Sequence, residues 1–97
     1  MSDGKQARRY FVSGIVQGVG FRYFTQHAGE RLKISGYVRN LADGRVEVFA
    51  IGTAQQLKEL RAVLERGPRF SSVSEVLEET ASRDPQYESG FVITHGD

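Results

Sequence analysis

Hydrophobic and polar side chains alternate along residues 8–16 and again along residues 45–51. A period of two places the hydrophobic side chains on one face of an extended chain, so both segments are predicted to be strands. Gly14 interrupts the first of them, which indicates a close approach of another backbone. We expect a further strand at residues 36–41, joined to the strand at 45–51 by Ala42-Asp43-Gly44, because Asp-Gly favours the positive φ of a tight hairpin turn.

Apolar residues recur at intervals of three and four in two other segments, which predicts two helices that each bury one stripe. The stripe of the first comprises Phe21, Phe24, Ala28 and Leu32, and that of the second comprises Ala54, Leu57, Leu60 and Leu64. The second helix opens at Thr53, which forms a capping box with Gln56. It ends at Gly67, which we expect to supply a left-handed cap before Pro68.

Two further strands, at residues 73–80 and 91–94, complete the order β-α-β-β-α-β plus a short final strand. Two right-handed crossovers with a hairpin between them predict an α+β fold, the ferredoxin-like α/β sandwich. We expect one antiparallel sheet with both helices on one face, strand order 4-1-3-2, and the fifth strand beside the second. Residues 1–7 are small and polar and predict a flexible N-terminal tail, and residues 8–97 a single domain.

Composition and charge narrow the possible functions. The chain has 97 residues, of which 39% are hydrophobic and 26% charged, as expected for one globular domain. It contains no cysteine, which excludes disulfides, thiol nucleophiles and thiolate metal sites, and its two histidines, His27 and His95, are too isolated for a zinc site. With 13 basic and 12 acidic residues, the net charge of +1 does not predict binding to nucleic acid or to a membrane surface. No apolar run reaches the roughly 20 residues that span a bilayer, and we expect a cytoplasmic monomer with no metal and no cofactor.

The most informative segment for chemistry is Gly14-Ile15-Val16-Gln17-Gly18-Val19-Gly20-Phe21-Arg22. A strand runs into a glycine-rich turn that opens a helix, so backbone N–H groups and the positive end of the helix dipole point at one place, which favours an anion. Arg22 lies in the first helical turn, where its guanidinium can bind a phosphate through two parallel donors. The segment is not a Walker A loop, because no Gly-Lys-Ser/Thr follows, and Tyr23 replaces the third glycine of a dinucleotide fingerprint. The same residues would also suit a tight turn with a solvated or salt-bridged Arg22.

The second segment of interest is Gly36-Tyr37-Val38-Arg39-Asn40, which ends just before the expected hairpin turn. Asparagine is common at strand ends and turns, so Asn40 is explained by local structure alone. The functional alternative is a carboxamide that projects from the strand toward the anion cradle and holds a water molecule.

These two segments resemble the two signatures of the acylphosphatase family. Val12-Ser13-Gly14-Ile15-Val16-Gln17-Gly18-Val19-Gly20-Phe21-Arg22 resembles the first, and Gly36-Tyr37-Val38-Arg39-Asn40 with the later Gly44, Val46 and Gly52 resembles the second. The likeness extends from about residue 10 to residue 93.

The resemblance implies hydrolysis of acyl phosphates, which are carboxylic–phosphoric mixed anhydrides, by direct attack of water without a metal or a covalent intermediate. It implies that Arg22 binds the phosphate and that Asn40 orients the attacking water. The backbone amides that would form the phosphate cradle are those of Gln17, Gly18, Val19, Gly20, Phe21 and Arg22. A small-molecule acyl phosphate is then the substrate, and inorganic phosphate is both product and inhibitor.

Two other functions stay open at this point. One is a non-catalytic regulatory or phosphate-binding domain of the same family, and the other is an RNA-binding module, since RNA-recognition motifs share this topology. The strand at 45–50 argues against RNA, because it lacks paired stacking aromatics and places Glu47 where a phosphate backbone would pass. We expect Tyr37 and Phe49 to be packing residues. We expect most of the strand arginines to be solvated, with steering of a phosphate dianion as the alternative, and these are Arg8, Arg9, Arg39 and Arg45. We also expect a solvated strand face at Glu75, Glu78 and Glu79.

Overall fold

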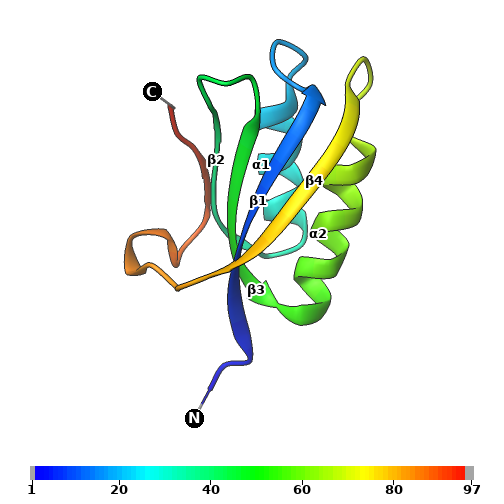
Figure 1. The fold of residues 1–97 in the computed structure, drawn as a ribbon. Coiled ribbons are helices and arrows are strands. Elements are labelled where there is room, and N and C mark those ends of the chain that lie inside the picture. The colour runs from blue at the N-terminus through cyan, green and yellow to red at the C-terminus, as the bar shows by residue number, and fades with distance from the viewer. Residues whose placement is uncertain (1, 96–97) are drawn as a thin grey trace.

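The computed structural model describes residues 2–95, which form a sheet with two helices packed on one face (Figure 1). The elements in chain order are β1 (Lys5–Ile15), α1 (Phe21–Arg31), β2 (Ser35–Asn40), β3 (Val46–Thr53), α2 (Ala54–Arg66), β4 (Ser72–Ala81), the 3-10 helix η1 (Pro85–Tyr87) and β5 (Phe91–Ile93). The strands lie in the order β4-β1-β3-β2-β5. The expected ferredoxin-like topology and strand order are therefore confirmed.

The sheet is mixed, and the prediction that it is wholly antiparallel is wrong. β5 pairs with β2 in parallel, whereas the other three pairs of strands are antiparallel. The reason is the path of the chain after β4. This strand ends at the end of the sheet where β2 begins, and residues 82–90 lead from there to the start of β5 (Figure 1).

The first strand begins earlier than expected, which shortens the predicted tail of residues 1–7. Lys5 pairs with Thr53 and Ala7 with Ile51, so both belong to the sheet. Ala7 is only 3% exposed because its methyl group packs in an apolar cluster on the sheet face away from the helices. Residue 1 of the predicted tail and residues 96–97 of the predicted domain lie outside the described residues.

The main core lies between the sheet and the helices. Its most buried members include Tyr10, Val12, Val38, Val48, Leu60 and Leu64. The predicted stripe of α1 is confirmed, but Ala54 of the α2 stripe is exposed, and Val63 is buried instead. At 100° per residue, Ala54 lies about 60° outside the arc that Leu57, Leu60 and Val63 span. The two helices have 11 and 13 residues, and within residues 2–95 no helix is suited to crossing a bilayer.

Both ends of α2 follow from local sequence. The Gln56 amide donates to the Thr53 hydroxyl at 3.2 Å and the Gln56 side chain accepts from the Thr53 amide at 2.8 Å, which confirms the capping box. Gly67 is the C-cap and has the expected positive φ, 68°, but its ψ of 171° lies outside the left-handed helical region. The residue before a proline is driven to extended ψ, and Pro68 follows.

Two glycines allow close packing around the sheet. Gly14 has φ 120° at a bulge between β1 and β4, and a Cβ there would overlap the carbonyl oxygen of Ser72, which confirms the expected close approach. Gly29 lies in α1, where the ring of Phe91 occupies the space that a Cβ would need. The helix glycine thus lets the short strand β5 pack directly against α1.

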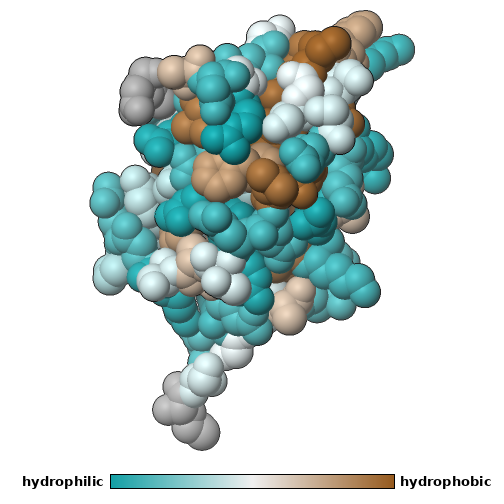
Figure 2. Space-filling view, in the orientation of Figure 1, coloured by the Kyte–Doolittle hydropathy of each residue, from teal (hydrophilic) through white to brown (hydrophobic). Residues whose placement is uncertain are grey.

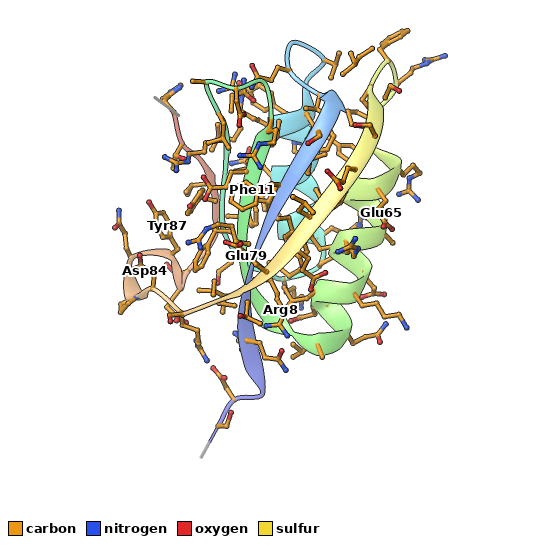
Figure 3. The ribbon with its side chains drawn as sticks, in the orientation of Figure 1. Arg8, Phe11, Glu65, Glu79, Asp84 and Tyr87 are labelled. Carbon is orange, nitrogen blue, oxygen red and sulfur yellow. The ribbon has the colours of Figure 1, made fainter. Side chains whose placement is uncertain are left out.

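A small aromatic cluster covers part of the sheet face away from the helices. Segment 82–90 brings Tyr87 onto this face (Figure 3), with its ring centroid 4.8 Å from that of Tyr37 and 6.0 Å from that of Phe49. Tyr37 also stacks on Phe49, so the expectation that both are packing residues is confirmed. Much of the remaining surface in this view is hydrophilic (Figure 2).

Ion pairs join six of the seven charged strand residues that we expected to be solvated, although Glu78 and Glu79 are exposed as expected. Arg9 lies opposite Glu79 in the β1–β4 ladder, and Arg39 lies opposite Glu47 in the β2–β3 ladder, so opposite charges meet across adjacent strands. The ion-paired residues of the predicted set are Arg8, Arg9, Arg39, Arg45, Glu78 and Glu79. Glu75 is exposed, as expected.

Glu47 is the buried centre of these charges, at 4% exposure. Its carboxylate accepts hydrogen bonds from Tyr37 at 2.7 Å, Arg39 at 2.6 Å and Arg9 at 3.0 Å. Burial opposes ionisation, but the donors from Tyr37 and Arg39 outweigh it, so the pKa of Glu47 lies below its ordinary value. The sequence interpretation placed Glu47 on an exposed face and missed this network.

Candidate active site

The turn between β1 and α1 has the backbone geometry of an anion cradle. Gly18 and Gly20 have φ values of 75° and 77°, whereas Val19 and Phe21 have negative φ. This alternation directs successive N–H groups into one concavity, which favours a bound anion. A Cβ on either glycine would meet no atom within 4 Å, so the backbone conformation and not crowding explains the glycines.

The N–H groups of this turn have no protein partner among the described residues. Gly20 caps α1 without any side-chain hydrogen bond, and the first backbone donor in the helix is the amide of Phe24, which reaches the Gly20 carbonyl at 3.0 Å. Within residues 2–95, the amides of residues 17–22 donate to no protein acceptor. Unpaired amides at a helix N-terminus form a ready site for a small anion.

Arg22 and Asn40 line one pocket beside this turn. The pocket has a volume of about 190 Å³ and is lined by Val16, Gly18, Gly20, Phe21, Arg22, Tyr23 and Asn40. It is smaller than the roughly 300–1,000 Å³ of sites that enclose drug-sized ligands. Its size suits a small group, such as a phosphoryl group, and none of its lining residues is acidic.

The guanidinium of Arg22 has no carboxylate partner within the described part of the chain. In this respect Arg22 differs from Arg9, Arg45 and Arg61, each of which forms an ion pair. The alternative interpretation, a salt-bridged Arg22, is therefore wrong for the described residues. A half-exposed, unpaired guanidinium beside free amides is available to an incoming anion.

Asn40 is the last residue of β2 and faces the helices. It lies two residues after the fully buried Val38, so both side chains are on the helix side of the sheet. The local role expected of a turn residue belongs to Asp43, whose carboxylate accepts from the Arg45 amide at 3.0 Å. The Asn40 carboxamide forms no hydrogen bond within residues 2–95 and borders the pocket of Arg22.

The side chain of Gln17 was missed by the sequence interpretation, which gave this residue only a backbone role. Its carboxamide nitrogen donates to the carbonyl of Leu41 at 2.8 Å and to the carbonyl of Arg45 at 2.9 Å. No local pattern marks a contact between segments so far apart in the sequence. Tyr23 was missed as well, although an aromatic residue just after Arg22 is a signal that could have suggested a pocket wall.

Other parts of the described chain are weaker candidates for a functional site. His27 and His95 are both exposed. Among residues 2–95 there is no group of three or more His, Asp or Glu side chains that could hold a metal ion. A pocket of about 240 Å³ on the opposite sheet face includes Arg9 and Arg39, but both arginines already bind Glu47.

The structure is a ferredoxin-like sandwich whose first strand-to-helix turn, within residues 2–95, has free amides beside an unpaired arginine, an arrangement that favours a small anion. Comparison with known proteins gives the family. The sequence profile of the acylphosphatase family matches residues 8–93, and the chain belongs to that family of hydrolases.

The relatives match along nearly the whole chain. The acylphosphatase of Koribacter versatilis (strain Ellin345) is 48% identical over 89 residues, which covers 92% of this chain and 81% of the relative. The crystal structure of acylphosphatase from Bacillus subtilis has a TM-score of 0.85 at 35% identity and covers 91% of this chain and 97% of that one. The structure of an acylphosphatase from Coxiella burnetii has a TM-score of 0.88 at 33% identity and covers 97% of this chain and 100% of that one.

Proposed function

We propose that this chain hydrolyses acyl phosphates to a carboxylate and inorganic phosphate by direct attack of water on phosphorus, with Arg22 and Asn40 as its catalytic residues. The observation that carries the proposal is the single pocket that joins Arg22 and Asn40 to a turn of unpaired amides. The guanidinium and the N–H groups supply hydrogen-bond donors for the oxygens of a phosphoryl group. The carboxamide supplies an acceptor for a water molecule.

The cradle binds the phosphoryl group. Amides of Gln17, Gly18, Val19, Gly20, Phe21 and Arg22 donate to its oxygens, and the Arg22 guanidinium adds two parallel charge-assisted bonds. Phosphoryl transfer has a loose transition state with charge spread over the equatorial oxygens. Fixed donors aimed at those oxygens stabilise the transition state without any reorganisation at the moment of reaction.

Asn40 positions the nucleophile. The side-chain carbonyl accepts a hydrogen bond from a water and holds it in line with the bond to be broken. The water oxygen forms a bond to phosphorus as the bond from phosphorus to the acyl oxygen breaks, and the carboxylate leaves with that electron pair. The water proton passes to a phosphoryl oxygen, since the pocket lining contains no acidic side chain that could accept it.

Three finer properties complete the proposal. Inorganic phosphate, as the product, competes with substrate for the cradle. The near balance of 13 basic and 12 acidic residues supports a protein that does not bind a charged partner surface. We also propose that the chain is a monomer with a cytoplasmic location.

The proposal is tested by the hydrolysis of benzoyl phosphate, followed by its ultraviolet absorbance. Wild-type chain should accelerate the reaction, and inorganic phosphate should inhibit it competitively. Arg22→Ala should show no acceleration. A wild-type chain that is correctly folded by circular dichroism yet leaves the spontaneous rate of benzoyl phosphate, acetyl phosphate and carbamoyl phosphate unchanged would overturn the proposed activity.

A further inference from the structure

The side chain of Gln17 joins the two halves of the pocket. Gln17 opens the turn that forms the cradle, and its carboxamide donates to the carbonyls of Leu41 and Arg45 in the β2–β3 hairpin at 2.8 and 2.9 Å. Asn40 is the residue directly before Leu41. One side chain thus connects the phosphate-binding segment with the hairpin that carries Asn40.

No strand ladder provides this connection. The pairing of β1 with β3 ends at Val12 and Val46, and beyond that point β1 pairs only with β4, as far as Ile15 opposite Ser72. The bulge at Gly14 bends the end of β1 at the same place. The sheet therefore fixes the turn relative to β4 but leaves a gap between the turn and the hairpin, which the Gln17 side chain spans.

The two acceptors close the hairpin. The Leu41 amide donates to the Arg45 carbonyl at 2.8 Å, and the Gly44 amide donates to the Leu41 carbonyl at 3.2 Å. Each carbonyl has a second lone pair, and Gln17 uses both of its amide hydrogens to fill them. A single planar group with two donors thereby fixes both the distance and the orientation of the hairpin end.

We propose that the Gln17 side chain is a positioning residue that sets the separation between the bound phosphoryl group and the water held by Asn40. This inference rests on the proposed function. The cradle amides and Arg22 belong to the turn and to α1 themselves, so they keep their arrangement without the Gln17 side chain. Asn40, in contrast, loses its fixed distance from them, and displacement of a reacting group by about 1 Å can cost about 100-fold in rate.

The experiment compares Gln17→Met, Gln17→Glu and the control Gln55→Met in the full chain. Methionine keeps the length of the side chain and the backbone N–H but has no donor, and glutamate keeps the shape but turns an acceptor toward the two carbonyls. Gln55 lies exposed on α2, away from the pocket. Benzoyl phosphate hydrolysis gives kcat and KM, and competitive inhibition gives the affinity for inorganic phosphate.

We expect kcat to fall by about 10- to 100-fold in both Gln17 variants, and in the uncharged Gln17→Met we expect KM and phosphate inhibition to stay within about threefold of wild type. Gln55→Met should match wild type in all three. A Gln17→Met variant with wild-type kcat would overturn the proposal, and so would a parallel loss of phosphate affinity, which would show that the side chain holds the cradle itself. Should Gln17→Met fail to fold by circular dichroism, Gln17→Leu decides instead, because it is also uncharged and also lacks the two amide donors.

The proposed function and the positioning role of Gln17 can fail separately. Absence of turnover in the wild type would contradict the proposed function. Turnover that is lost in Arg22→Ala but kept in both Gln17 variants would contradict only the positioning role.

Discussion

The carboxylate of Glu47 accepts a 2.7 Å hydrogen bond from the hydroxyl of Tyr37 on the sheet face opposite the pocket. Arg9 and Arg39 complete its coordination, and each guanidinium also lies over an aromatic ring, Arg9 over Phe49 and Arg39 over Tyr37. A buried charge that is saturated with donors stabilises the fold only while all its partners are present. This network is therefore a structural element that mutation can separate from the chemistry.

Glu47→Gln should lower the free energy of unfolding by about 1–3 kcal/mol, because it removes one member of the network and leaves two arginines without their buried partner. Benzoyl phosphate turnover at 25 °C should stay within about twofold, since Asn40 and Arg22 lie on the other side of the sheet. Urea unfolding and steady-state kinetics measure the two effects. The matched control is Glu79→Gln, whose side chain is 58% exposed and lies 3.7 Å from Arg9, and it should cost no more than about 0.5 kcal/mol.

Acid should destabilise the chain below about pH 4.5, the ordinary pKa of a glutamate carboxyl. Hydrogen bonds from Arg83 lower the pKa of Asp3 to about 2 and also lower that of Glu88, while the pKa of Glu47 lies below its ordinary value despite burial. A lowered pKa means that the folded chain binds fewer protons than the unfolded chain in this range. The stabilisation is then complete above the ordinary pKa and is lost as pH falls through the folded value.

Unfolding by urea at a series of pH values from 7 to 3 measures this dependence. Arg83→Gln should make the unfolding free energy less sensitive to pH between 4.5 and 3, because Asp3 and Glu88 then titrate near their ordinary values. Arg31 forms no ion pair among the described residues, so the control Arg31→Gln should leave the slope unchanged. An unaltered slope in the Arg83 variant would show that these surface pairs are screened by solvent.

Arg22→Ala should reduce kcat by about 100- to 1,000-fold or more and should weaken inhibition by inorganic phosphate by about 10-fold or more. Arg22→Lys should recover only a small part of either, because an ammonium is a single point charge without two parallel donors. Arg31→Ala, on the last turn of the same helix, is the control and should behave as wild type. Normal phosphate inhibition in Arg22→Ala would remove Arg22 from the binding site.

Asn40→Ala should reduce kcat by about 100-fold through loss of the positioned water, with phosphate inhibition kept within about threefold of wild type. Kinetics with benzoyl phosphate and isothermal titration with phosphate separate the two parameters. Circular dichroism serves as the check that β2 and its hairpin are intact. If phosphate affinity fell in step with kcat, Asn40 would be a structural residue of the cradle wall.

Local sequence rules predicted those parts of the fold that depend on neighbouring residues. The capping box of Thr53 and Gln56 and the stripe of α1 each arise from residues within a few positions of one another. Strand order followed from the handedness of the crossovers. The direction of β5 could not be predicted, because it depends on where segment 82–90 turns back toward β2.

In the candidate site, as in the fold, the features set by neighbouring residues were predictable and the contacts between distant segments were not. The glycine turn and Arg22 are adjacent in sequence, and alternation along β2 was enough to place Asn40 on the helix side once Val38 was known to be buried. The interactions of Gln17 and Glu47 were not predictable, because each links segments that meet only after the sheet has formed. The exposure of Ala54 was predictable, because helical spacing alone places it about 60° outside the arc of Leu57, Leu60 and Val63.

The contact between Gly29 and the ring of Phe91 has a consequence for the C-terminal end of the sheet. β5 is only three residues long, yet it covers the outer edge of β2, with the Gly36 amide bonded to Gly90 and the Thr94 amide bonded to Val38. Without the aromatic anchor, that edge would present unsatisfied backbone donors and acceptors to neighbouring molecules, which is how intermolecular strand addition begins. Proteolytic cleavage just before Phe91 would thus make the chain prone to aggregation through the exposed edge of β2, even though every residue of the proposed pocket would still be present.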